Sequence, residues 1–402
     1  MKYSRGTSKI GLPELYRFGA ELEAFNVNTG RAKEDKPSLY RSPESIEFLK
    51  QHRWKNANMF QEDLVMHGGA ECVSPILYDR EEDWQNLSEV CMHIKNFPGK
   101  YGDTVVTDDK CGCHVHIDAR TLTGKNIKET EAITANFLKI WAEGEELIYK
   151  MCNEEGSELR PGALENRQKG LTRLVMKLQH IKAMASPMGK KIKKDIDKGR
   201  LKVSYKKQNF LRRAITTGKL DPRRYYGLNL TNIGNPKKNT IEFRIGNGTL
   251  NPETIKQNVF LYASIIEAAR TAALEPEKNQ EQLNEFFRED VTEEQKADAF
   301  LNLLFEDEED RKIYRDRWES VKDAHVFERN QEQFAQTFKR EEFKQIAEKT
   351  PMTMVKDAFD KIREAMQQKD IKERETNDGL ELWNCINRSR WNFKFYWYWI
   401  SK

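Results

Sequence analysis

Pairs of ionisable side chains two residues apart recur in the first two thirds of the sequence. Three pairs share this spacing: Glu21 with Glu23, His114 with His116, and Glu242 with Arg244. Residues two apart on a β-strand point to the same face, with about 6.6 Å between their Cα atoms. Two carboxylates held this close repel one another unless water or a divalent cation neutralises them, and imidazole also binds metals. The pattern therefore predicts either exposed strand faces or one shared cation site.

Glu71 is a further carboxylate with unusual neighbours. It follows Gly68-Gly69 and precedes Ser74-Pro75. Glycine lets the backbone approach a ligand closely, although the same residues are also typical of a tight turn before an edge strand. Both interpretations stay open for Glu71 taken alone.

Arg244 stands shortly before a glycine-rich turn, residues 246–251, which leads into a helix that Pro252 opens. A helix N-terminus binds anions, and the guanidinium fork of arginine fits phosphate oxygens. Arg244 is therefore predicted to face a phosphate, with simple pairing to Glu242 as the alternative.

Hydrophobic alternation indicates the strands that must position these groups. Five runs read as strands that end at turn residues: residues 17–25, 64–74, 113–119, 225–231 and 240–245. Three runs repeat apolar residues at helical spacing: residues 82–97, 129–152 and 252–274. On the strand at 113–119, Asp118 is expected on the same face as His114 and His116. The ionisable pairs thus all lie on predicted strands.

The composition is that of a polar, helix-rich protein. Of its 402 residues, 38% are hydrophobic and 33% are charged, and no apolar run of about 18 residues predicts a transmembrane helix. The first 15 residues lack the apolar core of a signal peptide, so we expect a cytoplasmic protein with no membrane partner. The six cysteines include Cys111 and Cys113, whose spacing does not suit a zinc knuckle, and are expected to be reduced structural thiols.

Charge is unevenly distributed along the chain. Residues 160–224 contain 20 Lys or Arg against 4 Asp or Glu, a net charge of +16, so the other residues carry −12 of the total of +4. Such a segment is expected either as a solvated face or lid that holds ATP phosphates, or as a dock for a nucleic acid or another acidic macromolecule. The charge pattern leaves both open.

The last third of the chain is predicted to be helical. Residues 391–400 at its end are crowded with aromatic side chains. Packing onto the main body is the favoured interpretation, with an aromatic platform for a ligand or nucleobase as the alternative.

Together, the carboxylates, histidines and arginine favour one kind of chemistry. Oxygen ligands with some imidazole favour Mg²⁺ or Mn²⁺ over structural zinc. An arginine beside such a cluster is typical of phosphoryl transfer from a nucleotide.

Five short motifs occur in a specific order: Phe18-Gly19-Ala20-Glu21-Leu22-Glu23, Gly69-Ala70-Glu71-Cys72-Val73-Ser74-Pro75, Gly112-Cys113-His114-Val115-His116-Ile117-Asp118, Tyr226-Gly227-Leu228-Asn229, and Ile241-Glu242-Phe243-Arg244 through Gly248-Thr249-Leu250-Asn251. As an ordered set over residues 17–274, they resemble the amidoligase family of carboxylate–amine ligases, which has the glutamine synthetase and glutamate–cysteine ligase fold. The resemblance implies an α+β fold, with a curved antiparallel sheet and flanking helices. It implies a catalytic domain at 1–274 with a basic insertion at about 160–224, and a helical C-terminal region at 275–402 packed on that domain.

The same resemblance implies roles for individual residues. ATP and two or three Mg²⁺ or Mn²⁺ ions would lie in the concave face of the sheet. The implied metal ligands are Glu21, Glu23, Glu71, Glu242 and one of His114 and His116. Arg244 would contact the γ-phosphate and the transition state, and Asn229 would line the nucleotide or substrate pocket.

The implied reaction is the ATP-dependent formation of a carbon–nitrogen bond. ATP phosphorylates a carboxylate substrate, and an amine then attacks the acyl phosphate to give an amide, ADP and phosphate. The amine substrate could be a peptide, a protein or a polyamine. A carboxylate near the site must take the proton of the amine, and the sequence does not name it.

Two other functions are weighed against this one. The first is a Mg²⁺-dependent nuclease, or another nucleic-acid-modifying protein, that uses the basic segment. The second is a binding protein with a degenerate ligase fold. The position of Arg244 before a helix-opening turn and the order of the motifs argue against the nuclease. The degenerate fold is disfavoured by the complete set of Glu21, Glu23, Glu71, Glu242 and Arg244.

Overall fold

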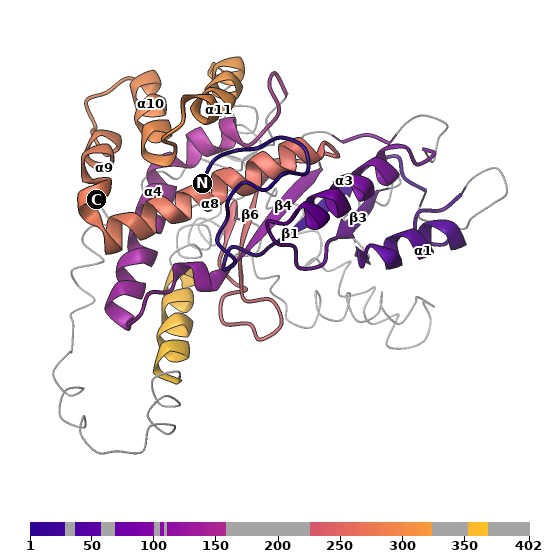
Figure 1. The fold of residues 1–402 in the computed structure, drawn as a ribbon, viewed down its shortest axis with the longest axis horizontal. Coiled ribbons are helices and arrows are strands. Elements are labelled where there is room, and N and C mark those ends of the chain that lie inside the picture. The colour runs from indigo at the N-terminus through magenta and orange to yellow at the C-terminus, as the bar shows by residue number, and fades with distance from the viewer. Residues whose placement is uncertain are drawn as a thin grey trace, which may run out of the picture.

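An antiparallel sheet with helices around it forms the described part of the chain (Figure 1). The structure is a computed structural model, and it describes residues 1–28, 37–57, 69–99, 105–107, 111–157, 226–323 and 353–368. Within these residues, six antiparallel strands pair in the order β2-β3-β1-β4-β6-β5. The strands are β1 (Phe18–Ala24), β2 (Lys55–Ala57), β3 (Ala70–Val73), β4 (Gly112–Asp118), β5 (Leu228–Asn229) and β6 (Thr240–Asn247). The fold is therefore α+β, as the sequence predicted.

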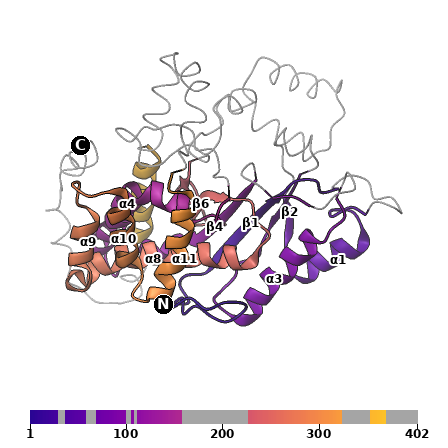
Figure 2. The same cartoon turned by 90° about the horizontal axis from the view of Figure 1, so that it is seen from above.

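Helices flank this sheet. They are α1 (Pro43–Gln51), α3 (Glu81–Lys95), α4 (Ile127–Met151), α8 (Pro252–Leu274), α9 (Gln280–Phe286), α10 (Glu293–Leu304) and α11 (Glu308–Val321), with short 3₁₀ helices η1 (Ala119–Leu122) and η3 (Pro276–Lys278). Residues 353–368 are also helical. Figure 2 shows α3 and α8 along the same face of the sheet, and α8 packs against β4, α3 and α4.

Aromatic stacking fixes which strand residues face these helices. Phe18 of β1 stacks on Trp84 of α3, with ring centroids 4.8 Å apart. Phe243 of β6 stacks on Tyr262 of α8, with ring centroids 4.2 Å apart and planes nearly parallel. Because successive strand residues point to opposite faces, the neighbours of these aromatic residues point away from α3 and α8. The ionisable pairs therefore share the face opposite to these helices.

The helix α8 begins and ends where the sequence predicted, at residues 252 and 274. Pro252 occupies its first turn, where the missing N–H costs no hydrogen bond. The side chain of Asn251 accepts a hydrogen bond from the backbone N–H of Glu253 at 3.1 Å and caps the helix. This end of the helix follows directly from β6, so the cap also fixes the path of the chain out of the sheet.

The strand predicted at residues 225–231 is much shorter than expected. Only Leu228–Asn229 pairs with β6, and residue 225 lies outside the described part. The side chain of Asn229 accepts hydrogen bonds from the N–H and the hydroxyl of Thr231. Such a local side-chain bond starts a turn in competition with the strand ladder. The segment at residues 230–239 is consequently a turn that leads into β6.

Several sequence predictions fall on residues that the structure does not describe. These are Gly68 and the start of the strand predicted at 64–74, the basic segment 160–224, and the aromatic residues 391–400. Five cysteines are described, all are buried, and none is in a disulfide with another described residue: Cys72, Cys91, Cys111, Cys113 and Cys152. No helix in the described stretches is both long enough and apolar enough to span a membrane.

Candidate metal centre

The sheet register places ionisable residues of four strands, and Asn229 of a fifth strand, directly opposite one another. Four cross-strand pairs form in this way: Glu23 with Glu71, Glu21 with His114, His116 with Glu242, and Glu242 with Asn229. Residues directly opposite in an antiparallel pair have Cβ atoms about 5 Å apart. The structure therefore brings together most of the predicted site residues: Glu21, Glu23, Glu71, His114, His116, Glu242 and Asn229.

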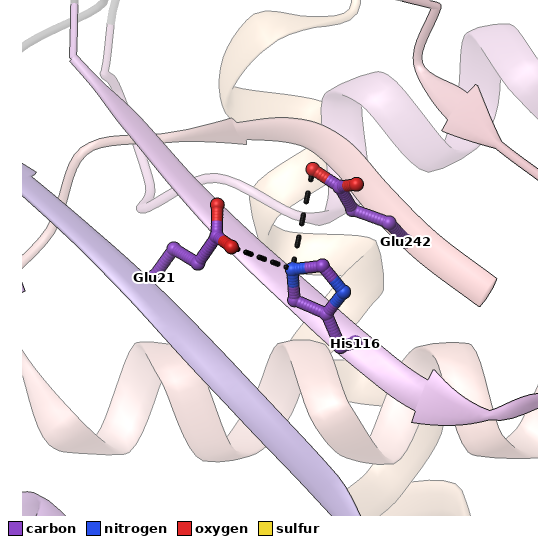
Figure 3. A group of neighbouring side chains, drawn as sticks. All are labelled: Glu21, His116 and Glu242. Carbon is purple, nitrogen blue, oxygen red and sulfur yellow. Dashed lines mark ion pairs between the residues drawn. The ribbon is translucent and has the colours of Figure 1, made fainter. Parts of the chain in front are cut away.

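Glu21 lies at the centre of this cluster. One carboxylate oxygen, Oε1, lies 3.1 Å from Nε2 of His116, as Figure 3 shows. The other oxygen, Oε2, lies 3.1 Å from Nδ1 of His114. The two imidazoles thus approach Glu21 from neighbouring positions of one strand, β4, and each contacts a different oxygen.

Glu242 holds the other side of the cluster. Its Oε1 pairs with the guanidinium of Arg244 and lies 4.0 Å from Nε2 of His116 (Figure 3). Its Oε2 accepts hydrogen bonds from Nδ2 of Asn229 at 2.7 Å and from Nδ2 of Asn232 at 3.3 Å. Two amides therefore hold one oxygen of Glu242, and the other oxygen faces Arg244 and the histidines.

Two groups of three possible metal ligands result from this geometry. One consists of Glu21, His116 and Glu242, and the other of Glu21, Glu71 and His114. In each group the ligand atoms lie within 4.8 Å of one another, which is short enough for one cation to contact all three. We call these groups the two triads. Each triad contains one histidine, and both contain Glu21.

Glu23 lies beside the second triad and is fully buried. Its Oε2 accepts a hydrogen bond from the N–H of Gly112 at 2.6 Å. Its Oε1 lies 3.8 Å from Nε2 of His114, and neither atom has a hydrogen-bond partner among the described residues. A buried polar atom without a partner costs about 1–3 kcal/mol. A cation held between such atoms would remove that cost, so the residues fit a bound metal.

Burial and the neighbouring carboxylates change the protonation of Glu71. Burial, followed by the charges of Glu21 and Glu23, raises the pKa of Glu71 to about 9. Burial alone would also raise the pKa of Glu21, but hydrogen bonds from His114 and His116 hold it well below its usual value. Glu71 is therefore neutral at pH 7 while no cation is bound, and Glu21 is charged.

The two histidines differ in protonation although they are neighbours on β4. Burial, with a further contribution from the charge of Arg244, lowers the pKa of His114. Burial opposes protonation of His116 too, but the charge of Glu242 and the contact with Glu21 raise its pKa overall. A metal ligand must be a neutral imidazole. The lowered pKa of His114 favours that neutral form, and the raised pKa of His116 opposes it.

Arg244 occupies an irregular position in β6. The register between β4 and β6 shifts between Cys113 and Val115, so two β6 residues, 244 and 245, face His114. The backbone N–H of Arg244 donates to the carbonyl of Gly227 at 2.8 Å. Bulges of this kind re-aim side chains and are common beside active sites. The alternative left open by the sequence, pairing of Arg244 with Glu242, is the contact observed, and the predicted phosphate contact stays a prediction.

Two residues near the site were missed by sequence reasoning, and both lie on the turn at residues 230–239. Asn232 bonds Glu242, as described above. Nζ of Lys238 lies 3.9 Å from Oε1 of Glu21, and the lysine side chain is half-exposed. The turn-forming composition of this segment predicted a loop but gave no signal that the loop would fold back over the cluster.

Asp118 was expected on the face of the two histidines but does not join the cluster. Its carboxylate pairs with the guanidinium groups of Arg17 and Arg120. It also accepts a hydrogen bond from the N–H of Arg120 and so caps η1. Asp118 is the last residue of β4 and still pairs with Thr240 of β6, so the two arginines at the end of the strand, and not its register, keep its carboxylate out of the cluster.

The chain matches no known protein-family model, no curated protein and no solved structure. The chemistry of the residues in the cluster is therefore the basis for assigning a function.

Proposed function

We propose that this chain is an ATP- and metal-dependent carboxylate–amine ligase that forms an amide bond through an acyl phosphate. The observation that carries the proposal is the pair of triads that share Glu21 and contain one imidazole each. Paired divalent cations about 4 Å apart are a common device for stabilising both the attacking and the leaving oxygen in phosphoryl transfer. The order of the sequence motifs supports the choice of an amide-forming ligase among such enzymes.

Bound Mg²⁺ or Mn²⁺ would polarise the phosphate oxygens and neutralise charge on the transferring phosphoryl group. Glu21 would contribute to both sets of ligands, with His116 and Glu242 in one set and Glu71 and His114 in the other. Glu23 is placed to bind or to accept hydrogen bonds from bound water. An imidazole in each triad favours Mn²⁺ more than an all-oxygen site would.

Arg244 would supply positive charge from the protein itself to the transferring phosphoryl group. It is buried, and the charges of the surrounding carboxylates keep its pKa raised in spite of burial. Glu242 holds the guanidinium at the edge of the first triad, and Asn229 and Asn232 hold Glu242. A preorganised charge in a buried site stabilises a developing negative charge more strongly than a solvated one.

The reaction proposed for this site has two steps. In the first, the carboxylate substrate takes the γ-phosphoryl group of ATP and releases ADP. In the second, an amine attacks the acyl carbon, gives a proton to a nearby carboxylate and expels phosphate, which leaves the amide. Each step builds negative charge on oxygen atoms close to Arg244 and the cation ligands.

We further propose that the sheet is that of the glutamine synthetase and glutamate–cysteine ligase fold. Three features support this: the six antiparallel strands, the helices α3 and α8 on one face, and the ionisable cluster on the other. The resemblance of the ordered motifs to the amidoligase family points in the same direction.

The direct test of the function is ADP release by purified protein with ATP and Mg²⁺ or Mn²⁺. We expect ADP only when a pool of amino acids, polyamines or cell extract is added, with an amide product that mass spectrometry identifies. No ADP with any pool would count against the ligase. Cutting of DNA or RNA without ATP would instead support the nuclease alternative, in which the basic segment 160–224 would bind the nucleic acid.

Arg244→Lys is expected to separate turnover from metal binding. Lysine keeps the charge but loses the planar fork, so ATP turnover should fall by about 100-fold or more. Mn²⁺ affinity, measured by calorimetry, should fall less than turnover does, by about tenfold, because Arg244 holds the ligand Glu242 but is not itself a ligand. Arg17→Lys is the matched control, since Arg17 pairs with a carboxylate outside the cluster. Equal turnover in both variants would exclude the role of Arg244.

Lys238→Met is expected to strengthen metal binding and to weaken nucleotide binding. The ammonium group now lies 3.9 Å from Oε1 of Glu21, so it competes with a cation for that oxygen, and it is free to contact a phosphate once displaced. We expect Mn²⁺ to bind about threefold more tightly and a non-hydrolysable ATP analogue about fivefold more weakly. Lys237→Met, one residue away, should change neither affinity, and an identical response of the two variants would contradict the assignment.

A further inference from the structure

The helix at residues 353–368 packs against the part of the chain that contains the sheet. Its buried side chains form an apolar stripe: Met354, Val355, Ala358, Ile362 and Met366. Arg363 pairs with Glu131 of α4, with 2.6 Å between their nitrogen and oxygen atoms. Figure 1 shows this helix in yellow beside α4. The helix is therefore docked on the same body that carries the metal centre.

The same helix contacts the backbone of the turn at residues 230–239. The N–H of Leu230 donates to Sδ of Met354 at 3.4 Å, and Nζ of Lys361 donates to the carbonyl of Thr231 at 3.4 Å. The turn also touches the helix at Gly234, where an added Cβ would lie 3.0 Å from Cβ of Lys361. Three positions along the turn are thus held against the helix.

These contacts lie next to the residues that hold the metal centre. Leu230 directly follows Asn229, and Thr231 directly precedes Asn232, and both amides donate to Oε2 of Glu242. β5, which ends at Asn229, is only two residues long, so its own ladder gives this segment little support. Each of the two hydrogen bonds to the helix is therefore made by a residue that directly neighbours an asparagine holding Glu242.

We infer that the helix at 353–368 is a positioning element of the metal centre, and that Met354 is its positioning residue for Glu242, acting through Leu230 and Asn229. This inference rests on the proposed cation site. Linkage makes the effect reciprocal: a helix that strengthens cation binding must itself be held more firmly when the cation is bound. A helix that merely covers apolar surface would show no such coupling.

Two measurements test the inference. Hydrogen exchange of the full-length wild-type chain should slow in residues 353–368 when Mn²⁺ is added, which requires no substitution. Calorimetry should show Mn²⁺ bound at least about fivefold more weakly by Met354→Ala than by the wild type. Met366→Ala is the matched control: it removes a buried methionine from the same helix, about 18 Å further along the axis, and should change Mn²⁺ affinity less than twofold.

The outcomes separate this inference from the proposed function. Mn²⁺ binding that is equal in Met354→Ala and Met366→Ala, or exchange in 353–368 that is unchanged by Mn²⁺, overturns the positioning role and leaves the cation site intact. A wild-type chain that binds no Mn²⁺ overturns both. Met354→Leu keeps the side-chain volume but removes the sulfur acceptor. It therefore shows whether the loss of Mn²⁺ affinity in Met354→Ala comes only from a cavity. We expect Met354→Leu to bind Mn²⁺ more weakly than the wild type.

Discussion

Glu21→Gln is expected to remove both cations together, because Glu21 is the one residue that the two triads share. Glutamine keeps the volume of the side chain but loses the charge that draws the cations and bridges them. Mn²⁺ affinity should fall by at least about 100-fold, and metal-dependent ATP turnover should fall with it. Calorimetry and ADP release measure the two effects.

Glu89→Gln is the matched control for this substitution. Glu89 also pairs with a histidine, His52, at 2.7 Å, but it lies on α3, which packs on the opposite face of the sheet. It should leave metal binding and turnover unchanged. Retention of full Mn²⁺ affinity by Glu21→Gln would show that the cluster is an ion-pair network without a metal.

Glu71→Gln is expected to stabilise the metal-free protein at pH 8 while it weakens metal binding. The pKa of Glu71 rises from 4.5 to about 9 on folding. A carboxyl group whose pKa is raised in the folded state contributes fully below its unfolded pKa, and this contribution is lost as the pH rises toward its folded pKa. Metal-free wild type should therefore lose on the order of 1–3 kcal/mol between pH 5 and pH 8 relative to Glu71→Gln.

Urea unfolding of both proteins in the presence of a chelator measures this difference. At pH 5 the wild-type side chain is mostly neutral, like glutamine, so the two stabilities should nearly coincide there and diverge as the pH rises. Cation binding by the wild type should release the proton of Glu71, and its Mn²⁺ affinity should increase up to about pH 9. Parallel pH profiles for the two proteins would contradict the crowding of carboxylates described here.

Much of the fold could be predicted from local sequence patterns. Strict alternation identified β1 and β4, and Pro252 with its preceding turn located the start of α8, because these signals depend only on near neighbours in the chain. β5 was overestimated because the Asn229 side chain starts a turn. That outcome depends on a hydrogen bond that propensity alone does not weigh.

The composition of the candidate site could also be predicted, but not its geometry. Because strand residues two apart point to the same face, the sequence placed Glu21 with Glu23 and His114 with His116. Only the sheet register shows that His114 is opposite Glu21 and that His116 is opposite Glu242. Register is set by pairing between distant segments. The division of the ligands into two triads was for this reason beyond what the sequence could give.

The contributions of Asn232, Lys238 and Met354 depend on how a turn and a distant helix pack. None of them lies in a periodic or motif-like pattern. Their roles follow from single contacts of 3.3, 3.9 and 3.4 Å with Glu242, Glu21 and Leu230. Such contacts are properties of the folded chain as a whole.

Anomalous diffraction from crystals grown with Mn²⁺ and a non-hydrolysable ATP analogue is the sharpest test of the paired cation site. We predict two Mn²⁺ peaks bridged by Glu21, one beside His116 and Glu242 and the other beside Glu71 and His114, with the analogue's phosphates next to both. Crystals with bound analogue but no Mn²⁺ within ligand distance of Glu21 would contradict it.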